Sequence, residues 1–453
     1  MAGSSDSVVP RLMARLERSA TVHLIILGFL GLLLLIPLAF VDSAVSDRRN
    51  TRSEAIRGIA ETWGLEQTVS GPYISVPYSY TQRDDKGVTS VYTAEMFFLP
   101  ETLAVSGDVV PEVRYRGIYQ ANLYVANLQI SGTFAAVDWT GTEITPDSIN
   151  WDGARLVLGI SDPKAIRDAV EVQWDKNALA FGPGKGRNPF ISNGVSVPLR
   201  NLQGNKSGHS FDLNLRLAGS SSLRFSPYGK ETTVKLTSTW QHPSFLGSYL
   251  PLERAISENG FTANWKVLYL GRGYPQRFSS LGESASSFGE QDFGVSLISV
   301  LDHYILTDRS IKYGILFIFM TFLAFFMFEL LSGLRIHPVQ YLLVGVAQAL
   351  FFLNLLAISE HASFVIAYAA GSAGVTLLIS GYAMAVVKRT SAAVSIFAGL
   401  SLLYTTLYSL LQLEDYALLV GSLGLFFTLA VVMWVTRKVD WYRIELGRAD
   451  TQG

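Results

Sequence analysis

Five almost uninterrupted apolar segments fill the last third of the chain, and they restrict the fold more than any other feature. Each is near or above twenty residues, the length that an α-helix needs to cross the roughly 30 Å hydrocarbon core of a bilayer. We predict membrane spans at residues 313–334, 339–358, 362–387, 391–411 and 416–436. The joints between them are very short, so neighbouring spans must run antiparallel.

Composition agrees with a membrane protein. Hydrophobic residues make up 49% of the 453 residues and charged residues only 16%, below the roughly 25% that is usual for soluble domains. A sixth apolar segment, residues 22–41, lies near the N-terminus and is interrupted only by Pro37. It exceeds the roughly 7–15 apolar residues of a cleavable signal peptide, so we predict an uncleaved anchor.

Charge in the joints predicts the orientation, because basic residues stay on the cytoplasmic side. Arg11, Arg15 and Arg18 precede the anchor and place the N-terminus in the cytoplasm. Alternate joints and the tail are basic, and the joints between them contain no Lys or Arg. The basic positions are Arg335 with His337, Lys388 with Arg389, and Arg437 with Lys438; the others are Glu360 with His361 and Glu414 with Asp415. Both termini are therefore predicted to be cytoplasmic.

The region between the anchor and the second span has a different pattern. In residues 210–217 apolar and polar side chains alternate, which is typical of a half-buried antiparallel strand. Similar short runs at 123–130, 156–160 and 234–238 are separated by Gly-, Pro- and Ser-containing turns. Many short strands of this kind predict a sandwich-like β domain. Since the chain has no cysteine, this domain must be stable without disulfides.

These observations give an α+β membrane protein with six transmembrane helices: one N-terminal anchor and a five-helix C-terminal bundle. A large β-rich periplasmic domain is inserted between the first and second helices. Apolar residues at helical spacing within residues 47–64 predict that the first span continues as a helix. We expect residues 293–306 to form an amphipathic segment that returns to the membrane. The predicted parts are a cytoplasmic N-terminus 1–21, anchor 22–41, periplasmic domain 42–310, bundle 313–436 and cytoplasmic tail 437–453.

The sequence offers little for chemistry. The net charge of −1 argues against nucleic-acid binding, and the six scattered histidines have no metal-ligand spacing. No Gly-x-Ser-x-Gly elbow is present, and the glycines of residues 182–187 lack the context of a phosphate-binding loop. We therefore expect no cofactor and no metal. The acidic residues of the β domain are dispersed, so a catalytic carboxylate pair is neither identified nor excluded.

Within the bundle, Glu329 lies near the cytoplasmic end of its span, where a carboxylate is costly unless it is paired or hydrated. It is either a proton or ion relay or the partner of Arg335, which forms the following turn with His337 and Pro338. Gln348 and Asn354 are candidates for hydrogen bonds between helices.

The outer joints allow two interpretations. Glu360, His361, Glu414 and Asp415 could form a patch for a cation, a peptide amine or a partner, or could only end the spans at water.

Several segments carry a family resemblance. They are residues 115–119, 328–341, 359–361, 412–417 and 439–442, reading YRGIY, FELLSGLRIHPVQY, SEH, QLEDYA and VDWY. Together they resemble the CreD family of bacterial inner-membrane proteins, described as cell-envelope-integrity or colicin-tolerance proteins. The resemblance implies a role in envelope integrity and in the response to cell-wall stress, with no catalytic activity to carry over. It also favours a specific role for the outer acidic joints.

The sequence thus predicts a non-enzymatic inner-membrane protein that acts through its exported domain and the outer face of its bundle. Expected partners are the lipid bilayer and envelope proteins or cell-wall material, with no nucleic acid. Glu360, His361, Glu414 and Asp415 are expected to tie the domain to the bundle, while Glu329, Arg335 and His337 form a second candidate site. A transporter or lipid-handling protein is the alternative, and an envelope enzyme is the third class.

Overall fold

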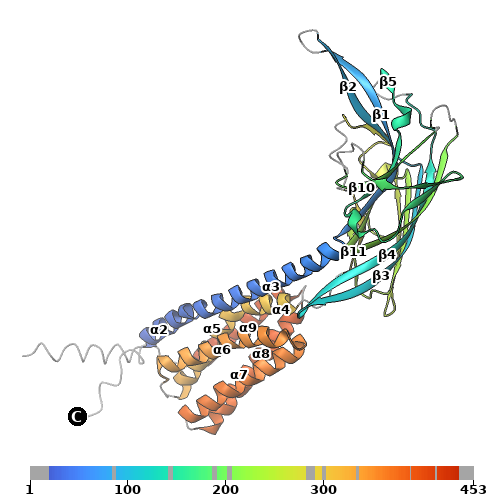
Figure 1. Ribbon diagram of the computed structural model, residues 1–453. Helices are drawn as coiled ribbons and strands as arrows, with labels where there is room; N and C mark the ends of the chain where they lie inside the picture. The colour runs from blue at the N-terminus through green and yellow to red at the C-terminus, as the bar shows by residue number, and fades with distance from the viewer. Residues whose placement is uncertain are drawn as a thin grey trace, which may run out of the picture. The chain divides into compact units, whose positions relative to one another are not determined.

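The computed structural model describes residues 20–83, 88–140, 146–185, 191–200, 202, 207–281, 291–297, 303–332, 336–387, 389–413 and 416–437. The chain divides into two compact units. One contains the chain up to Thr51 and from Leu301 onward, and the other is Arg52–Val300. The first unit is helical and the second is built from β-strands (Figure 1).

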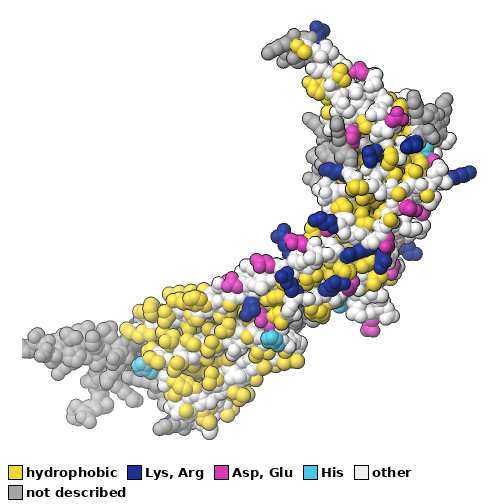
Figure 2. Space-filling view, viewed as in Figure 1, with side chains coloured by type: hydrophobic (Ala, Val, Ile, Leu, Met, Phe, Trp, Pro, Cys, Tyr) yellow, Lys and Arg dark blue, Asp and Glu magenta, His cyan; other side chains and the backbone are white. Residues whose placement is uncertain are grey.

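Apolar helices form the first unit. They are α2 (Ala20–Leu33), α3 (Leu35–Trp63), α4 (His303–Lys312), α5 (Gly314–Ser332), α6 (Pro338–Ser359), α7 (Phe364–Val387), α8 (Thr390–Gln412) and α9 (Ala417–Thr436). Hydrophobic side chains cover most of the visible surface of this unit (Figure 2). Within the described residues, five helices are long and apolar enough to cross a membrane, or six if the pair α4–α5, bent by 45°, counts as one span.

The first two helices are nearly one. The backbone N–H groups of Leu34 and Leu38 donate to carbonyls four residues earlier, at 3.0 and 3.4 Å, so the helical ladder passes through the break between α2 and α3. The resulting helix, Val22–Trp63, has 42 residues. This confirms the prediction that residues 47–64 continue the first span as a helix.

Helix α6 packs against the first helix through a glycine. A Cβ on Gly345 would lie 2.1 Å from Cδ1 of Leu34 and 3.1 Å from the ring of Phe322 on α5. Leu34 is almost fully buried. Small residues allow close packing in membranes, where shape and hydrogen bonds hold helices together more than water exclusion does. Gly345 therefore marks a close contact of α2–α3, α5 and α6.

The second unit contains two sheets. The ten-stranded first sheet contains β14 (Pro243–Gly247), β18 (Phe293–Leu297), β12 (Ser222–Ser226), β1 (Gln67–Arg83), β6 (Arg155–Ile160), β10 (Gly194–Pro198) and β9 (Gly182–Pro183), with β2 (Thr89–Phe98), β5 (Ser148–Ile149) and β17 (Arg277–Ser279) off this path. The eight-stranded second sheet runs β15 (Glu253–Ser257), β16 (Gly260–Leu268), β13 (Glu231–Ser238), β3 (Thr102–Arg116), β4 (Tyr119–Phe134), β11 (His209–Ser220), β7 (Glu171–Trp174) and β8 (Asn177–Ala180).

A single hydrophobic core lies between these sheets. In β11 the alternation seen in the sequence places Phe211, Leu213 and Leu215 in that core. The residues between them are partly or fully exposed. The predicted strand runs at 123–130, 156–160 and 234–238 lie in β4, β6 and β13.

One prediction about this unit is wrong. Residues 293–297 form β18, a strand of the first sheet, and not an amphipathic segment on the membrane. Phe293, Val295 and Leu297 alternate with smaller residues and are buried in the core, so the period is two and not that of a helix. The return helix α4 begins only at His303.

Candidate functional site

One polar group lies among the apolar side chains of α2, α5 and α6, and we call it the inner cluster: His23, Glu329 and Tyr341. The hydroxyl of Tyr341 donates to Oε2 of Glu329 at 2.9 Å. Nε2 of His23 is 3.4 Å from the same oxygen. The three residues come from three helices, so one carboxylate connects the first helix to two helices of the bundle.

The inner cluster is enclosed by aromatic rings. Tyr341 is fully buried and contacts the rings of Phe322 and Phe325 edge-on, with centroids 5.5 and 6.2 Å apart. The side chains of His23 and Glu329 are only 20% and 16% exposed. A carboxylate at such a place needs a hydrogen-bond donor or a counter-charge, and the hydroxyl of Tyr341 is such a donor.

A second polar group, the outer cluster, consists of Arg48, Tyr304 and Glu360. The hydroxyl of Tyr304 on α4 donates to Oε1 of Glu360 at 3.2 Å. Nε of Arg48 on α3 lies 3.6 Å from the same oxygen. Glu360 is 10% exposed and Arg48 is 54% exposed, so the arginine reaches in from the surface to a largely buried carboxylate at the end of α6.

The two clusters are built alike and lie about one bilayer apart. Each joins a carboxylate to a tyrosine hydroxyl and to a basic side chain of the first helix. At about 1.5 Å per residue, that helix rises about 37 Å from His23 to Arg48, and α6 rises about 28 Å from Tyr341 to Glu360. A hydrocarbon core of about 30 Å within a bilayer of about 40–45 Å would place one cluster near each interface.

The other predicted site residues have different surroundings. His337 caps α6: its Nδ1 accepts from the N–H of Val339 at 3.2 Å, and its own N–H donates to the side chain of Gln340 at 3.0 Å. His361 is exposed next to Glu360. Arg335, Glu414 and Asp415 lie outside the described residues, so their predicted contacts, including the pair of Arg335 with Glu329, remain predictions.

The two intramembrane amides differ. Nε2 of Gln348 donates to the hydroxyl of Thr321 on α5 at 2.5 Å, and both side chains are buried. The predicted hydrogen bond between helices is therefore confirmed for Gln348. Asn354 lies on the exposed side of α6, and its side chain forms no hydrogen bond within the part of the chain that the structure describes.

Sequence reasoning missed four members of the two clusters. His23 and Tyr341 lie at span ends, where polar and aromatic side chains are common. Arg48 and Tyr304 lie in helical segments with many polar residues, so neither stands out in the sequence. The available signal was the need of Glu329 and Glu360 for donors. Nothing in the local sequence identifies which distant donors would meet them, because helix packing decides that.

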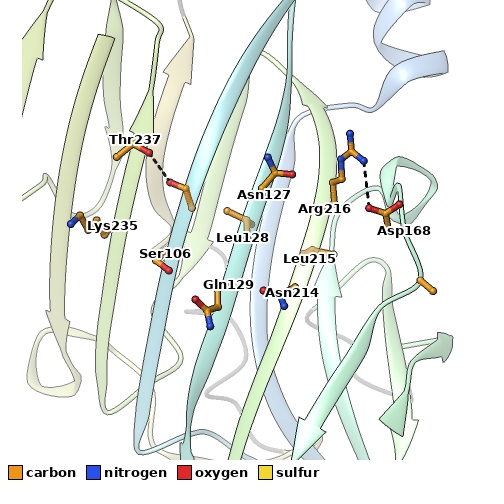
Figure 3. A pocket seen from close by; sticks show the side chains of 12 residues that line it. Ser106, Asn127, Leu128, Gln129, Asp168, Asn214, Leu215, Arg216, Lys235 and Thr237 are labelled. Atoms are coloured by element: carbon orange, nitrogen blue, oxygen red, sulfur yellow. Dashed lines mark hydrogen bonds and ion pairs between the residues drawn. The ribbon is translucent and has the colours of Figure 1, made fainter. Parts of the chain in front are cut away.

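The second sheet carries a polar groove of about 700 Å³ on its outer face. Figure 3 shows that side chains of β13, β3, β4 and β11 line it, among them Lys235, Gln129 and Asn214. An ion pair joins Arg216 to Asp168 at 3.6 Å. A solvated polar face is usual for antiparallel sheets. Among the residues that line this groove, Asp168 is the one carboxylate. The groove therefore lacks the paired acids of a glycosidase.

A partly buried carboxylate, Asp292, directly precedes β18 of the first sheet and lies beside two serines. The hydroxyl of Ser226 donates to Oδ1 of Asp292 at 2.6 Å, and the hydroxyls of Ser70 and Ser226 are 2.7 Å apart. Burial raises the pKa of Asp292, although the hydrogen bond from Ser226 and the charge of Arg224 oppose this. Ser226 uses its proton on Asp292, so Ser70 is the donor between the serines. Within the described residues, no group of three or more His, Asp or Glu could hold a metal ion.

Fold and clusters together define an integral membrane protein of the helical-bundle type that carries a large β-sandwich unit. Residues 19–442 match the family described as "Inner membrane protein CreD". The Escherichia coli protein of that description is 35% identical over 418 residues, which cover 92% of each chain. The chain therefore belongs to the CreD family, as its sequence motifs predicted.

Solved structures add nothing to this assignment. A crystal structure of a mutant M1 zinc metallopeptidase from Deinococcus radiodurans aligns with 37% of this chain and 38% of its own, at 11% identity and a TM-score of 0.19. A second crystal structure of a mutant of that enzyme, bound to a Tyr-Ser-Ala substrate, aligns with a TM-score of 0.20 and 12% identity over 37% and 39% of the two chains. Similarities this low carry no argument about fold or activity.

Proposed function

We propose that this inner-membrane protein supports envelope integrity without catalysis, by transmitting the state of its β-rich unit to the helical bundle through the outer cluster. In this proposal the β-rich unit is periplasmic, both termini are cytoplasmic, and α4–α5 forms one of six spans. The basic and acidic alternation of the joints supports that orientation.

The observation that carries the proposal is the composition of the outer cluster. The chain enters the β-rich unit through α3 and leaves it just before α4. Arg48 of α3 and Tyr304 of α4 both contact the carboxylate of Glu360. A displacement of either connection would therefore act on the end of α6.

The first connection is helix α3 itself. Helix α3 runs from the membrane-spanning part without a linker and ends at Trp63. The guanidinium groups of Arg114 and Arg167 lie 3.9 and 4.3 Å from the ring centroid of Trp63, and its Nε1 donates to the carbonyl of Tyr124 at 3.4 Å. The β-rich unit thus holds the end of the same helix whose middle contacts Glu360.

The test is complementation of a deletion strain, scored by sensitivity to detergent and to a β-lactam, with membrane levels of all proteins matched. Glu360→Ala should fail to restore resistance, because it removes the acceptor shared by both connections. His361→Ala, at the exposed neighbouring position, is the control and should complement. Full complementation by Glu360→Ala at matched levels would contradict the proposal.

A charge exchange separates loss of contact from loss of fold. Arg48→Glu alone should impair complementation, and the double variant Arg48→Glu with Glu360→Arg should recover at least part of it. No recovery in the double variant would mean that the pair does not act as the connection.

A further inference from the structure

The two sheets of the β-rich unit differ in width at one edge. Strand β14 ends the first sheet there, and β15 ends the second. The ring of Phe245 on β14 lies over β16, with centroids 5.9 Å from Phe261 and 5.7 Å from Trp265. Since β14 covers β16, the next strand, β15, has no strand of the first sheet opposite it.

Strand β15 continues the core-facing side of its sheet into solvent. Arg254 and Ile256 pair in register with Ala263 and Phe261, which are buried in the core, so all four face the same side. Ile256 is nevertheless 51% exposed, and Leu252, which continues the alternation just before the strand, is 76% exposed. The core surface thus runs on, uncovered, by the width of one strand.

The main-chain groups at this edge are also available. Among the described residues, β14 pairs only with β18 and β15 only with β16. Strands in a sheet are about 4.8 Å apart, so one further strand bonded to β14 would lie over β15. Unprotected sheet edges of this kind accept an added strand.

Arg254 lies at the centre of the exposed side of β15, between Leu252 and Ile256, and its charge specifies what the added strand must carry. The guanidinium of Arg254 lies 6.0 Å from the ring centroid of Phe245, and no carboxylate within the described residues forms an ion pair with it. An acidic side chain above Arg254 would gain a charge-assisted hydrogen bond in a partly dehydrated place, while apolar side chains on either side would cover Leu252 and Ile256.

We propose that this edge binds an extended segment of a partner protein, which adds as a strand to β14 and has the pattern apolar–x–acidic–x–apolar. Main-chain hydrogen bonds would supply affinity, and the three inward side chains specificity. Only the source of the segment, another envelope protein, rests on the proposed function. A second copy paired through β15 fits less well, because it would extend the second sheet and leave the gap in the first.

Binding can be tested on the purified full-length protein with a fluorescein-labelled peptide, acetyl-TVTETVT-amide, by fluorescence anisotropy. Wild-type protein should bind it, and Arg254→Glu should weaken binding at least tenfold. Arg254→Glu should instead prefer the peptide acetyl-TVTKTVT-amide. Lys176→Glu, an exposed charge reversal at the turn between β7 and β8, is the matched control and should bind like wild type. No binding, or equal binding by Arg254→Glu, would overturn the proposal.

Two further measurements distinguish other occupants. Because the chain has no cysteine, an Ile256→Cys variant can detect a second copy at this edge. A disulfide-linked dimer formed in nanodiscs would show that the occupant is a second copy of this chain and not a partner segment. Complementation of the deletion strain separates this inference from the proposed function. If Arg254→Glu loses the peptide but complements fully, the proposed function stands and the envelope origin of the strand is wrong.

Discussion

The inner and outer clusters each join a carboxylate, a tyrosine hydroxyl and a basic side chain, but the basic side chains, His23 and Arg48, have different surroundings. His23 of the inner cluster is 20% exposed and packed near aromatic rings, with its ring centroid 6.2 Å from that of Phe326. Arg48 of the outer cluster is 54% exposed. Water and salt therefore reach the inner cluster less than the outer one, where solvent screens the ion pair of Arg48 with Glu360.

This difference suggests a division of roles. The inner cluster anchors the first helix where few other polar partners are available. The outer cluster leaves an exposed arginine that can shift with its helix, which suits a contact that transmits movement. Three substitutions in the helices test this comparison, and a fourth extends it to the β-rich unit; they follow in order of decreasing expected effect, each with its controls.

Removal of the inner carboxylate should have the largest effect. Glu329→Ala leaves the buried hydroxyl of Tyr341 without its acceptor and removes the carboxylate beside His23, and breaking a buried pair in this way costs about 3 kcal/mol. The measurement is unfolding of the purified protein by increasing dodecyl sulfate in mixed micelles, followed by circular dichroism. Glu360→Ala should cost less, and Asn354→Ala should be neutral. Equal losses for both glutamates would remove the distinction between the clusters.

The close helix contact at Gly345, between the two clusters along α6, should have the next largest effect. Gly345→Leu places a side chain where Leu34 and Phe322 already meet, and overpacking of this kind costs about 1–3 kcal/mol. In the same unfolding assay it should destabilise the protein more than Gly399→Leu, since a Cβ at Gly399 on α8 meets no atom within 4 Å. Equal effects at the two glycines would mean that the first helix does not need close packing on α6.

The outer ion pair should contribute little, and its contribution should depend on salt. Arg48→Gln should cost about 0.2–1 kcal/mol at low ionic strength. That cost should shrink when the salt concentration is raised to about 1 M, where the screening length is about 3 Å. The cost of Glu329→Ala should change little over the same range. A salt-independent effect of Arg48→Gln would indicate that the arginine acts by packing.

The smallest effect concerns pH and the β-rich unit, where no base within the described residues forms an ion pair with Asp292. Burial raises the pKa of Asp292. Its contribution to stability is therefore present below the pKa of the unfolded chain and is lost as pH rises through the folded pKa. Asp292→Asn should remove this loss, so the free energy of unfolding should fall less between pH 4 and pH 7 than in the wild type.

Asp175 provides a control of opposite sign. Burial alone would raise the pKa of Asp175, but hydrogen bonds from His209 and Ser210 outweigh it and lower that pKa. Asp175→Asn should therefore reduce the loss of stability as pH falls below about 4, the usual pKa of an aspartate. Unfolding of the β-rich unit followed by tryptophan fluorescence measures both variants. The same pH response in both would contradict the assigned directions.

Much of the fold could be predicted because its signals are local. The length and apolarity of each span, and the alternation in β11, report the environment of individual residues, and these repeat along one element. The wrong prediction at residues 293–297 shows where local signals fail: five mostly apolar residues suit either a strand or a membrane-facing segment until their neighbours are known. The candidate site was half predicted. Glu329 stood out because a carboxylate within an apolar span is costly, and Glu360 stood out because it lies in an acidic joint, but their partners did not.

The sequence by itself determined that this is a CreD-family membrane protein with a β-rich insertion, because hydrophobic lengths, strand periods and motifs are written within short stretches. Only the tertiary structure decided that His23 and Tyr341 share one carboxylate, that Arg48 and Tyr304 share another, and that β15 lies uncovered beyond β14. These contacts join residues far apart in the chain, and they depend on how helices and sheets pack. No local pattern of residue types encodes such packing.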